Sequence, residues 1–164
     1  MELDQLDLAL LTALREHPRS GPLELSRQVE VARATVQSRL QRMEEAGVIT
    51  GYGPDIDLEA AGHRLAAFVT LEIAQGALEE VASELAAMPT IVEAYMTTGT
   101  ADVVCKVAAT DHVDLQATLL DLNRSTAVVR STSVVVLGTV VAPRVLPALA
   151  RTAQHRVSRA PAHR

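Results

Sequence analysis

The spacing of apolar residues changes partway along the chain, and this change divides it into two parts. In the N-terminal part, apolar residues recur every three or four positions, as in Val36, Leu40 and Met43, which is the spacing of an amphipathic helix. From Arg64 onward, residues 65–73 alternate between two faces in the two-residue period of a strand. We therefore expect an α+β protein with a helical N-terminal domain and a sheet-containing C-terminal domain.

The first 52 residues are predicted to form three helices and a short extended segment. The helices are expected over residues 5–16, 22–29 and 33–46, and the extended segment over residues 48–52. Asp4 is a suitable N-cap for the first helix, Pro22 suits the first position of the second, and Gly47 can end the third with a positive φ. Three helices in this order are typical of a helix-turn-helix.

The third helix carries polar and cationic side chains away from its apolar stripe. A helix-turn-helix holds one helix in the major groove of DNA. Short polar side chains can reach phosphates or base edges there, and arginines can bind phosphates or guanine. The candidate DNA-binding residues are Arg33, Thr35, Ser38, Arg39 and Arg42.

Composition narrows the class of nucleic-acid partner. The formal net charge of −5 excludes a uniformly basic protein, so any contact with DNA must come from a local patch of basic residues. Residues 27–42 contain four arginines and only one acid, Glu30, so this stretch is locally basic. Aromatic residues make up 2% of the chain, which disfavours a base-stacking surface for single strands and leaves duplex DNA as the expected partner.

The second part of the chain is predicted to have the order βαββαβ. Strands are expected over residues 64–73, 91–97, 102–108 and 128–137, and helices over residues 78–88 and 111–122. This order is the ferredoxin-like pattern, in which an antiparallel sheet carries both helices on one face. The other face would be apolar and exposed, so we expect a second subunit to cover it.

The resulting domain map has four parts. We assign residues 1–52 to the DNA-binding domain, 53–63 to a hinge, 64–142 to the ferredoxin-like domain and 143–164 to a basic tail. The tail contains Pro147 and Pro161 and shows little periodicity, so much of it is expected to be disordered.

Several kinds of site are not expected. The single cysteine, Cys105, lies among valines and is predicted to be a buried strand residue, so it provides neither an intrachain disulfide nor a cysteine-based zinc site. No cofactor or metal site is expected, because no metal-ligand spacing or phosphate-binding glycine loop is present. No apolar run is long enough to span a bilayer and no signal peptide precedes the first helix, which predicts a soluble, cytoplasmic, nucleoid-associated protein.

Three stretches resemble the leucine-responsive and asparagine-responsive (Lrp/AsnC) regulators. They are residues 3–7 (LDQLD), residues 36–52 (VQSRLQRMEEAGVITGY) and the turn at residues 98–102 (TGTAD), and the resemblance covers about residues 3–142. It implies a winged helix-turn-helix joined to a RAM, or ACT-like, domain. It also implies a homodimer, often assembled into tetramers or octamers, that binds an amino acid or related molecule between C-terminal domains.

The resemblance also assigns candidate effector-binding residues. Matching positions are Thr98, Gly99, Thr100, Asp102, Ser131, Thr132 and Ser133. A glycine turn exposes backbone N–H groups to a carboxylate and Asp102 could hold an ammonium, whereas the structural alternative is that Gly99 makes the turn and Asp102 caps it. The chain departs from the family at Ala101, where an aromatic residue is common, at Ala32, where many members have serine, and at Glu30, where many have glycine.

Two alternative functions remain open at this point. The same two-domain plan resembles sirohaem decarboxylases, whose substrate carries many carboxylates, but the C-terminal domain contains few basic residues to bind them. These are Arg64, Lys106, Arg124 and Arg130. The other alternative is an architectural DNA-binding protein that senses no ligand.

Overall fold

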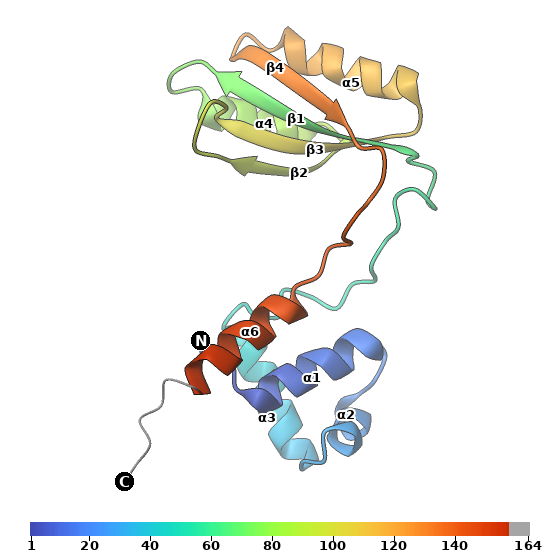
Figure 1. Ribbon diagram of the computed structural model, residues 1–164, viewed down its shortest axis with the longest axis vertical. Coiled ribbons are helices and arrows are strands. Elements are labelled where there is room, and N and C mark those ends of the chain that lie inside the picture. Colours follow the sequence, from blue (N-terminus) through green and yellow to red (C-terminus); the bar gives the residue numbers. More distant parts are fainter. Residues whose placement is uncertain (158–164) are drawn as a thin grey trace. The chain divides into compact units, whose positions relative to one another are not determined.

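The computed structural model describes residues 1–157 and divides into two compact units (Figure 1). Unit 1 contains Met1–Asp55 together with the chain from Val141 onward, and unit 2 is Ile56–Val140. The chain therefore passes from one unit to the other twice. The first passage falls within the predicted hinge, and the second returns the C-terminal segment to the helix-turn-helix.

Unit 1 begins with three helices, which confirm the predicted elements to within one residue at each end. They are α1 (Gln5–Glu16), α2 (Pro22–Gln28) and α3 (Arg33–Glu45). Their apolar faces meet in a core of Leu10, Ala13, Leu25, Val36, Leu40 and Met43. Each helix is amphipathic and short, so packing of these faces, rather than helix propensity alone, holds the unit together.

Local chemistry explains where these helices begin and end. Asp4 caps α1 and forms a capping box with Asp7, in which each carboxylate accepts a hydrogen bond from the other residue's backbone N–H. Gly47 follows α3 with φ of +68°, the left-handed conformation that glycine adopts without steric cost. Glu30 has φ of +55°, a conformation that is sterically costly for a residue with a side chain, and carries this strain in the turn before α3.

The segment after α3 closes the core without forming a strand. Val48 and Ile49 pack against the helices, and both backbone N–H groups donate to the Met43 carbonyl. Residues 48–52 were expected to be extended, but they carry no regular secondary structure.

The C-terminal tail differs from the sequence expectation. Residues 146–157, assigned to a tail expected to be largely disordered, form a helix, α6 (Leu146–Val157). Pro147 is compatible with this helix because it lies in the first turn, where a backbone N–H has no intrahelical partner. Leu146 and Leu149 are partly buried beside α1, so tertiary packing stabilises a helix that periodicity alone did not predict. Residues 158–164 lie outside the described residues.

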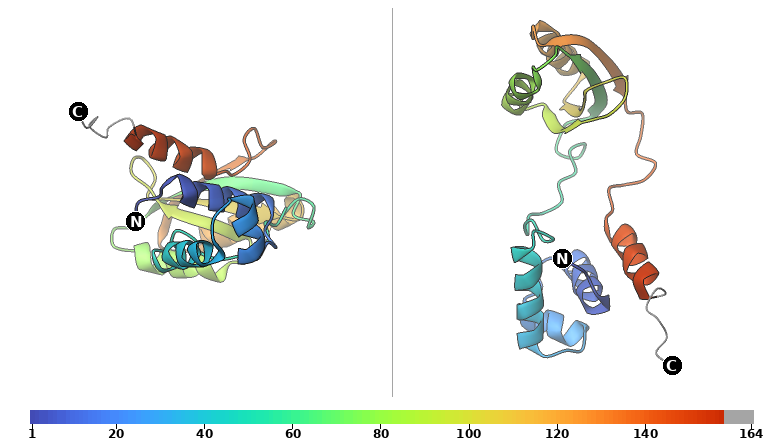
Figure 2. Two further views of the ribbon diagram at one scale, coloured as in Figure 1. Left: turned by 90° about the horizontal axis from the view of Figure 1, so that it is seen from below. Right: turned by 90° about the vertical axis from the view of Figure 1, so that its left-hand side faces the viewer.

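Unit 2 is a four-stranded antiparallel sheet with two helices on one face (Figures 1 and 2). Its elements are β1 (Leu65–Ile73), α4 (Leu78–Ala87), β2 (Ile91–Met96), β3 (Val103–Ala109), α5 (His112–Arg124) and β4 (Val128–Val135). The strand order β2-β3-β1-β4 places β1 between β3 and β4. The predicted ferredoxin-like βαββαβ fold is confirmed.

Alternate residues of the sheet form the core under the helices. Val69, Leu71 and Val107 have no exposed surface and pack with Val81 and Leu85 of α4 and Leu115 and Leu122 of α5. Cys105 on β3 lies in this core as predicted, and burial raises the pKa of its thiol to about 11. The thiol is therefore protonated at neutral pH.

The outer face of the sheet, opposite the helices, carries large apolar side chains. Phe68 of β1 lies directly across from Val134 of β4, and their exposed fractions are 46% and 63%. Tyr95 of β2 is 58% exposed and lies across from Val104 of β3. Covering this face would remove apolar surface from water, as expected from the sequence.

Within the part of the chain that the structure describes, no helix is long and apolar enough to cross a membrane.

Candidate DNA-binding surface and effector site

The third helix presents one buried and one exposed face. Val36, Leu40 and Met43 are buried in the core, as predicted. Thr35, Ser38 and Arg42 are exposed and repeat at intervals of three and four residues, which places them together on one side of α3. An exposed row of hydroxyl and guanidinium groups on a braced helix can enter a groove of DNA.

Arg33 does not share that side of α3. It lies nine residues before Arg42, about two and a half turns, so the two side chains leave the helix in opposite directions. Arg33 is exposed at the first position of the helix, and Ala32 before it provides no side-chain cap. Arg33 could therefore contact DNA only at the N-terminal end of α3.

A buried carboxylate connects α1 to α3. Asp7 has no exposed surface, and its Oδ2 accepts a hydrogen bond from Nη2 of Arg42 at 2.7 Å. Its Oδ1 accepts another from Nη1 of Arg39 at 3.1 Å. The Arg42 side chain is nevertheless 49% exposed, so it can bind Asp7 and still meet solvent or a ligand.

Arg39 is held more tightly to α1 than Arg42. Its guanidinium also pairs with Asp4, and its side chain is 27% exposed. Partial burial acts to raise the pKa of Asp4, but the hydrogen bond from Arg39 and that from the backbone of Asp7 outweigh it and lower the pKa. The predicted DNA-binding residue Arg39 thus has an intramolecular role at the edge of the exposed face.

The role of Asp7 was not predicted from the sequence. A signal for it was present, because Leu3, Asp7, Leu10 and Leu14 recur at helical spacing, which places an acid on an apolar stripe. A buried carboxylate requires a charged or hydrogen-bonding partner, but the sequence does not say which one.

The predicted effector turn lies between β2 and β3. Gly99 has φ of +119°, so the turn requires glycine, and Thr98 and Thr100 beside it are exposed. The Asp102 carboxylate accepts a hydrogen bond from the Ile73 backbone N–H at 2.8 Å, and the Asp102 N–H donates to the Leu71 carbonyl. Asp102 therefore ties the turn to the end of β1, while its side chain remains exposed.

The three predicted effector residues of β4 do not point in one direction. Ser131 lies across from Leu71, so it reaches the same end of β1 as Asp102, and its hydroxyl donates to Asn123 of α5 at 2.7 Å. Thr132 lies across from Thr70 on the outer face, whereas Ser133 lies across from the core residue Val69. A ligand on one face of one chain can contact Thr132 or the two serines, but not all three.

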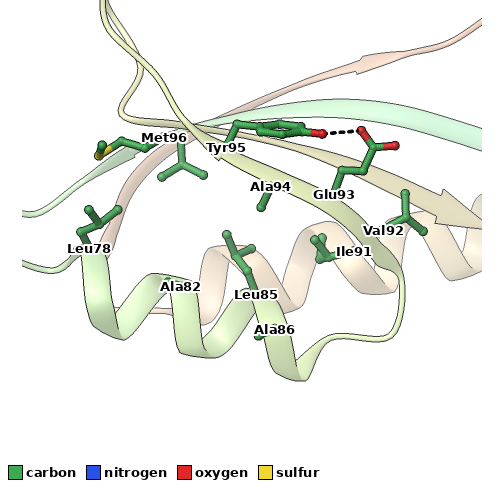
Figure 3. A pocket seen from close by; sticks show the side chains of 11 residues that line it. Leu78, Ala82, Leu85, Ala86, Ile91, Val92, Glu93, Ala94, Tyr95 and Met96 are labelled. Carbon is green, nitrogen blue, oxygen red and sulfur yellow. Dashed lines mark hydrogen bonds between the residues drawn. The ribbon is translucent and has the colours of Figure 1, made fainter. Parts of the chain in front are cut away.

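Unit 2 also has an apolar groove of about 480 Å³ between α4 and β2 (Figure 3). Leu78, Ala82 and Leu85 line it from the helix, and Ala94 and Met96 line it from the strand. None of the predicted effector residues lines this groove. Among the side chains that the structure describes, no group of three or more histidines, cysteines or acids could hold a metal ion.

Both units match known families. Residues 3–50 match a winged helix-turn-helix DNA-binding domain, and residues 66–146 match the Lrp/AsnC ligand binding domain. The HTH-type transcriptional regulator FL11 of Pyrococcus horikoshii is 35% identical over 73% of this chain and 79% of its own length. The chain belongs to the Lrp/AsnC family.

Solved structures of this family have the same fold. AsnC of Escherichia coli superposes with a TM-score of 0.83 at 25% identity, covering 90% of this chain and all of AsnC. A transcriptional regulator of Neisseria meningitidis, solved in complex with L-Met, gives a TM-score of 0.78 at 26% identity over 85% of this chain and 93% of its own. This Lrp/AsnC protein is therefore a DNA-binding transcriptional regulator with a C-terminal ligand-binding domain.

The buried position of Asp7 predicts a loss of stability when its charge is removed. Asp7→Asn leaves Arg42 without its carboxylate partner and Arg39 with Asp4 alone, and is expected to lower the free energy of unfolding of unit 1 by about 2–3 kcal/mol. Urea denaturation followed by circular dichroism measures the change. Glu16→Gln, an exposed charge removal on the same helix, is the control. Equal midpoints for the two variants would contradict the proposed importance of the buried pair.

Proposed function

We propose that this protein binds duplex DNA through the exposed face of α3 and regulates transcription in response to an amino acid or related molecule. The observation that supports the DNA surface most directly is the grouping of Thr35, Ser38 and Arg42 opposite the buried stripe of α3. Arg39 lies beside this face, and Arg33 lies at the N-terminal end of α3 on the other side of the helix. Asp7 positions Arg42 from within the unit while half of that side chain remains accessible.

The effector is proposed to bind at the end of the sheet where the β2–β3 turn and β4 approach β1. The exposed turn Thr98–Asp102 presents hydroxyl and backbone groups, and Asp102 retains one carboxylate oxygen without a hydrogen bond within the described residues. A carboxylate suits the ammonium group of an amino acid. The L-Met complex of the Neisseria meningitidis relative supports this class of ligand.

We further propose that the outer face of the sheet is covered by a second copy of unit 2, giving a homodimer that can assemble further. The exposed pair Phe68 and Val134 supports this arrangement. A dimer would also bring Thr132, which faces outward, to the contact between two chains. In this way, residues that diverge in one chain could contribute to a site shared by two. The expected location is the cytoplasm, at the nucleoid.

A regulatory role is favoured over a sirohaem-decarboxylase-like activity, and no catalytic residue is proposed. Three of the four basic side chains of the predicted C-terminal domain already face acids: Lys106 pairs with Glu93, Arg124 with Asp121 and Arg130 with Glu72. These pairs are spread over β2 and β3, α5, and β4 and β1, so they do not form one cationic site for a substrate with many carboxylates.

Replacing the hydroxyls on the exposed face of α3 should weaken DNA binding without destabilising the protein. The double variant Thr35→Ala/Ser38→Ala is expected to lower affinity for the protein's own promoter at least about fivefold, because each lost hydrogen bond contributes about 1 kcal/mol. Fluorescence anisotropy measures this. Gln37→Ala, an exposed substitution that leaves α3 in another direction, should bind like the parent. Unchanged affinity in the double variant would place the DNA surface elsewhere.

The charge of Asp102 should be needed for effector binding. Asp102→Asn keeps an oxygen that can accept from the Ile73 N–H, so the fold should persist while the interaction with an ammonium is lost. We expect L-Met, or another of the standard L-amino acids tested singly, to raise the melting temperature of the parent but not of Asp102→Asn. Asp111→Asn, an N-cap at which asparagine also serves, is the control. A normal response in Asp102→Asn would contradict the site.

Disrupting the outer face should separate the subunits. Val134→Asp places a charge beside Phe68 and is expected to shift the dimer to a monomer in light scattering. Val113→Asp makes the same substitution on α5, where the valine is 74% exposed, and should leave the assembly unchanged. A monomeric parent, or a Val134→Asp variant that remains dimeric, would overturn the proposed sheet-to-sheet contact.

A further inference from the structure

The C-terminal helix belongs to the DNA-binding unit. Unit 1 includes the chain from Val141 onward, and α6 packs against α1 (Figure 2). Leu146 and Leu149 of α6 line an apolar hollow of about 420 Å³ together with Leu11 and Leu14 of α1. These contacts anchor the C-terminal segment on the helix-turn-helix, although it follows the ligand-binding domain in the sequence.

This segment reverses the net charge of the unit. Residues 1–55 contain six arginines and nine acids, a formal net charge of −3, which is unfavourable for a surface that approaches phosphates. Residues 141–164 contain five arginines and no acid, so unit 1 as a whole carries +2. Residues 56–140 contain four basic residues and eleven acids, a net charge of −7. The positive balance of unit 1 therefore depends on its C-terminal segment.

Half of the arginines in residues 1–55 are also neutralised locally. Arg15 pairs with Asp55 at 2.8 Å, and Arg39 and Arg42 pair with the carboxylates of α1. In contrast, Arg144 and Arg151 are exposed, and neither side chain has a hydrogen bond or ion pair within the part of the chain that the structure describes. Arg151 lies on the side of α6 that is turned away from Leu146 and Leu149.

We propose that the C-terminal segment of unit 1, which carries Arg144 and Arg151 and is anchored by α6 on α1, is a second DNA-contacting element that binds the phosphate backbone. The proposal rests on the proposed DNA-binding function of this chain. Arginine is suited to this contact because its planar guanidinium can form two hydrogen bonds with one phosphate. Two such groups, Arg144 and Arg151, have side chains that the structure describes, and the sequence of the segment contains three further arginines.

The position of α6 determines what kind of contact this is. Within unit 1, α1 lies between α3 and α6 (Figure 2). The segment therefore binds phosphates outside the groove that α3 enters and does not read bases. Phosphate contacts carry no direct sequence information, so the segment raises affinity for all duplexes alike and makes binding more dependent on salt.

Charge-neutralising variants of the full chain test this inference. Each lost phosphate contact should reduce the slope of log affinity against log salt concentration by about 0.9. The double variant Arg144→Gln/Arg151→Gln is therefore expected to lower the slope by roughly 2. Affinity at a fixed salt concentration should fall by the same factor for the promoter duplex and for a random duplex of equal length. A second variant also neutralises the remaining arginines: Arg156→Gln, Arg159→Gln and Arg164→Gln.

A matched control removes the same number of charges from unit 2. Arg124→Gln/Arg130→Gln should bind DNA with the parent's slope, because neither residue belongs to the DNA-binding unit. Thermal unfolding of every variant confirms that α6 and the core are intact. The parental midpoint is expected for Arg144→Gln/Arg151→Gln, since both side chains are exposed and unpaired within residues 1–157.

The outcomes separate this inference from the proposed function. If the parent binds DNA and the five-arginine variant has the same salt dependence of affinity, the segment makes no phosphate contact. That result would leave the proposed DNA-binding surface of α3 unaffected. If that variant binds DNA more tightly, the segment occupies an acidic surface such as that of unit 2 and competes with DNA, which also overturns the inference. If the parent binds no duplex DNA, both the proposed function and this inference are wrong. A reduced slope with equal losses on promoter and random duplexes supports the second DNA element.

Discussion

The hydrogen bonds accepted by the Asp7 carboxylate connect the first helix of the DNA-binding unit to the helix proposed to enter DNA. A buried charge is tolerated only when it is paired, so this residue constrains both helices at once. Leu10 of α1 also lies in one core with Val36 and Met43 of α3, but apolar contact has no direction. The hydrogen bonds from Arg39 and Arg42 to Asp7 are directional, and they fix how α3 is oriented against α1. The bond from Arg42 also holds that side chain at the edge of the exposed face of α3.

The C-terminal domain depends on a different constraint, the alternation of side chains along β1. One set of its residues fills the core beneath α4 and α5, and the other set reaches the outer face, where Phe68 remains exposed. The same alternation divides Ser131, Thr132 and Ser133 between the two faces. An effector site that uses all three would require more than one chain, and in the proposed dimer ligand binding would then be linked to assembly.

Charge is distributed between the two units in a way that the net value of −5 conceals. The ligand-binding unit is strongly acidic, and the cations of its strands are paired with neighbouring acids. Residues 1–55, which contain the helix-turn-helix, also have a negative net charge. The net charge of unit 1 is positive only because the unit includes the residues that follow unit 2 in the sequence. A regulator with an acidic composition can in this way present a locally basic surface to DNA.

Much of this structure was determined by local features of the sequence. Helix caps, glycine turns and hydrophobic periods act within about four residues, so Asp4 marked the start of α1, Gly47 the end of α3, and the alternation of residues 65–73 the strand β1. The exposed face of α3 followed from the same periodicity. The partners of Asp7 lie 32 and 35 residues away, and α6 is stabilised by contact with α1. Those features were decided only by tertiary structure, because packing brings together side chains whose separation along the chain carries no periodic signal.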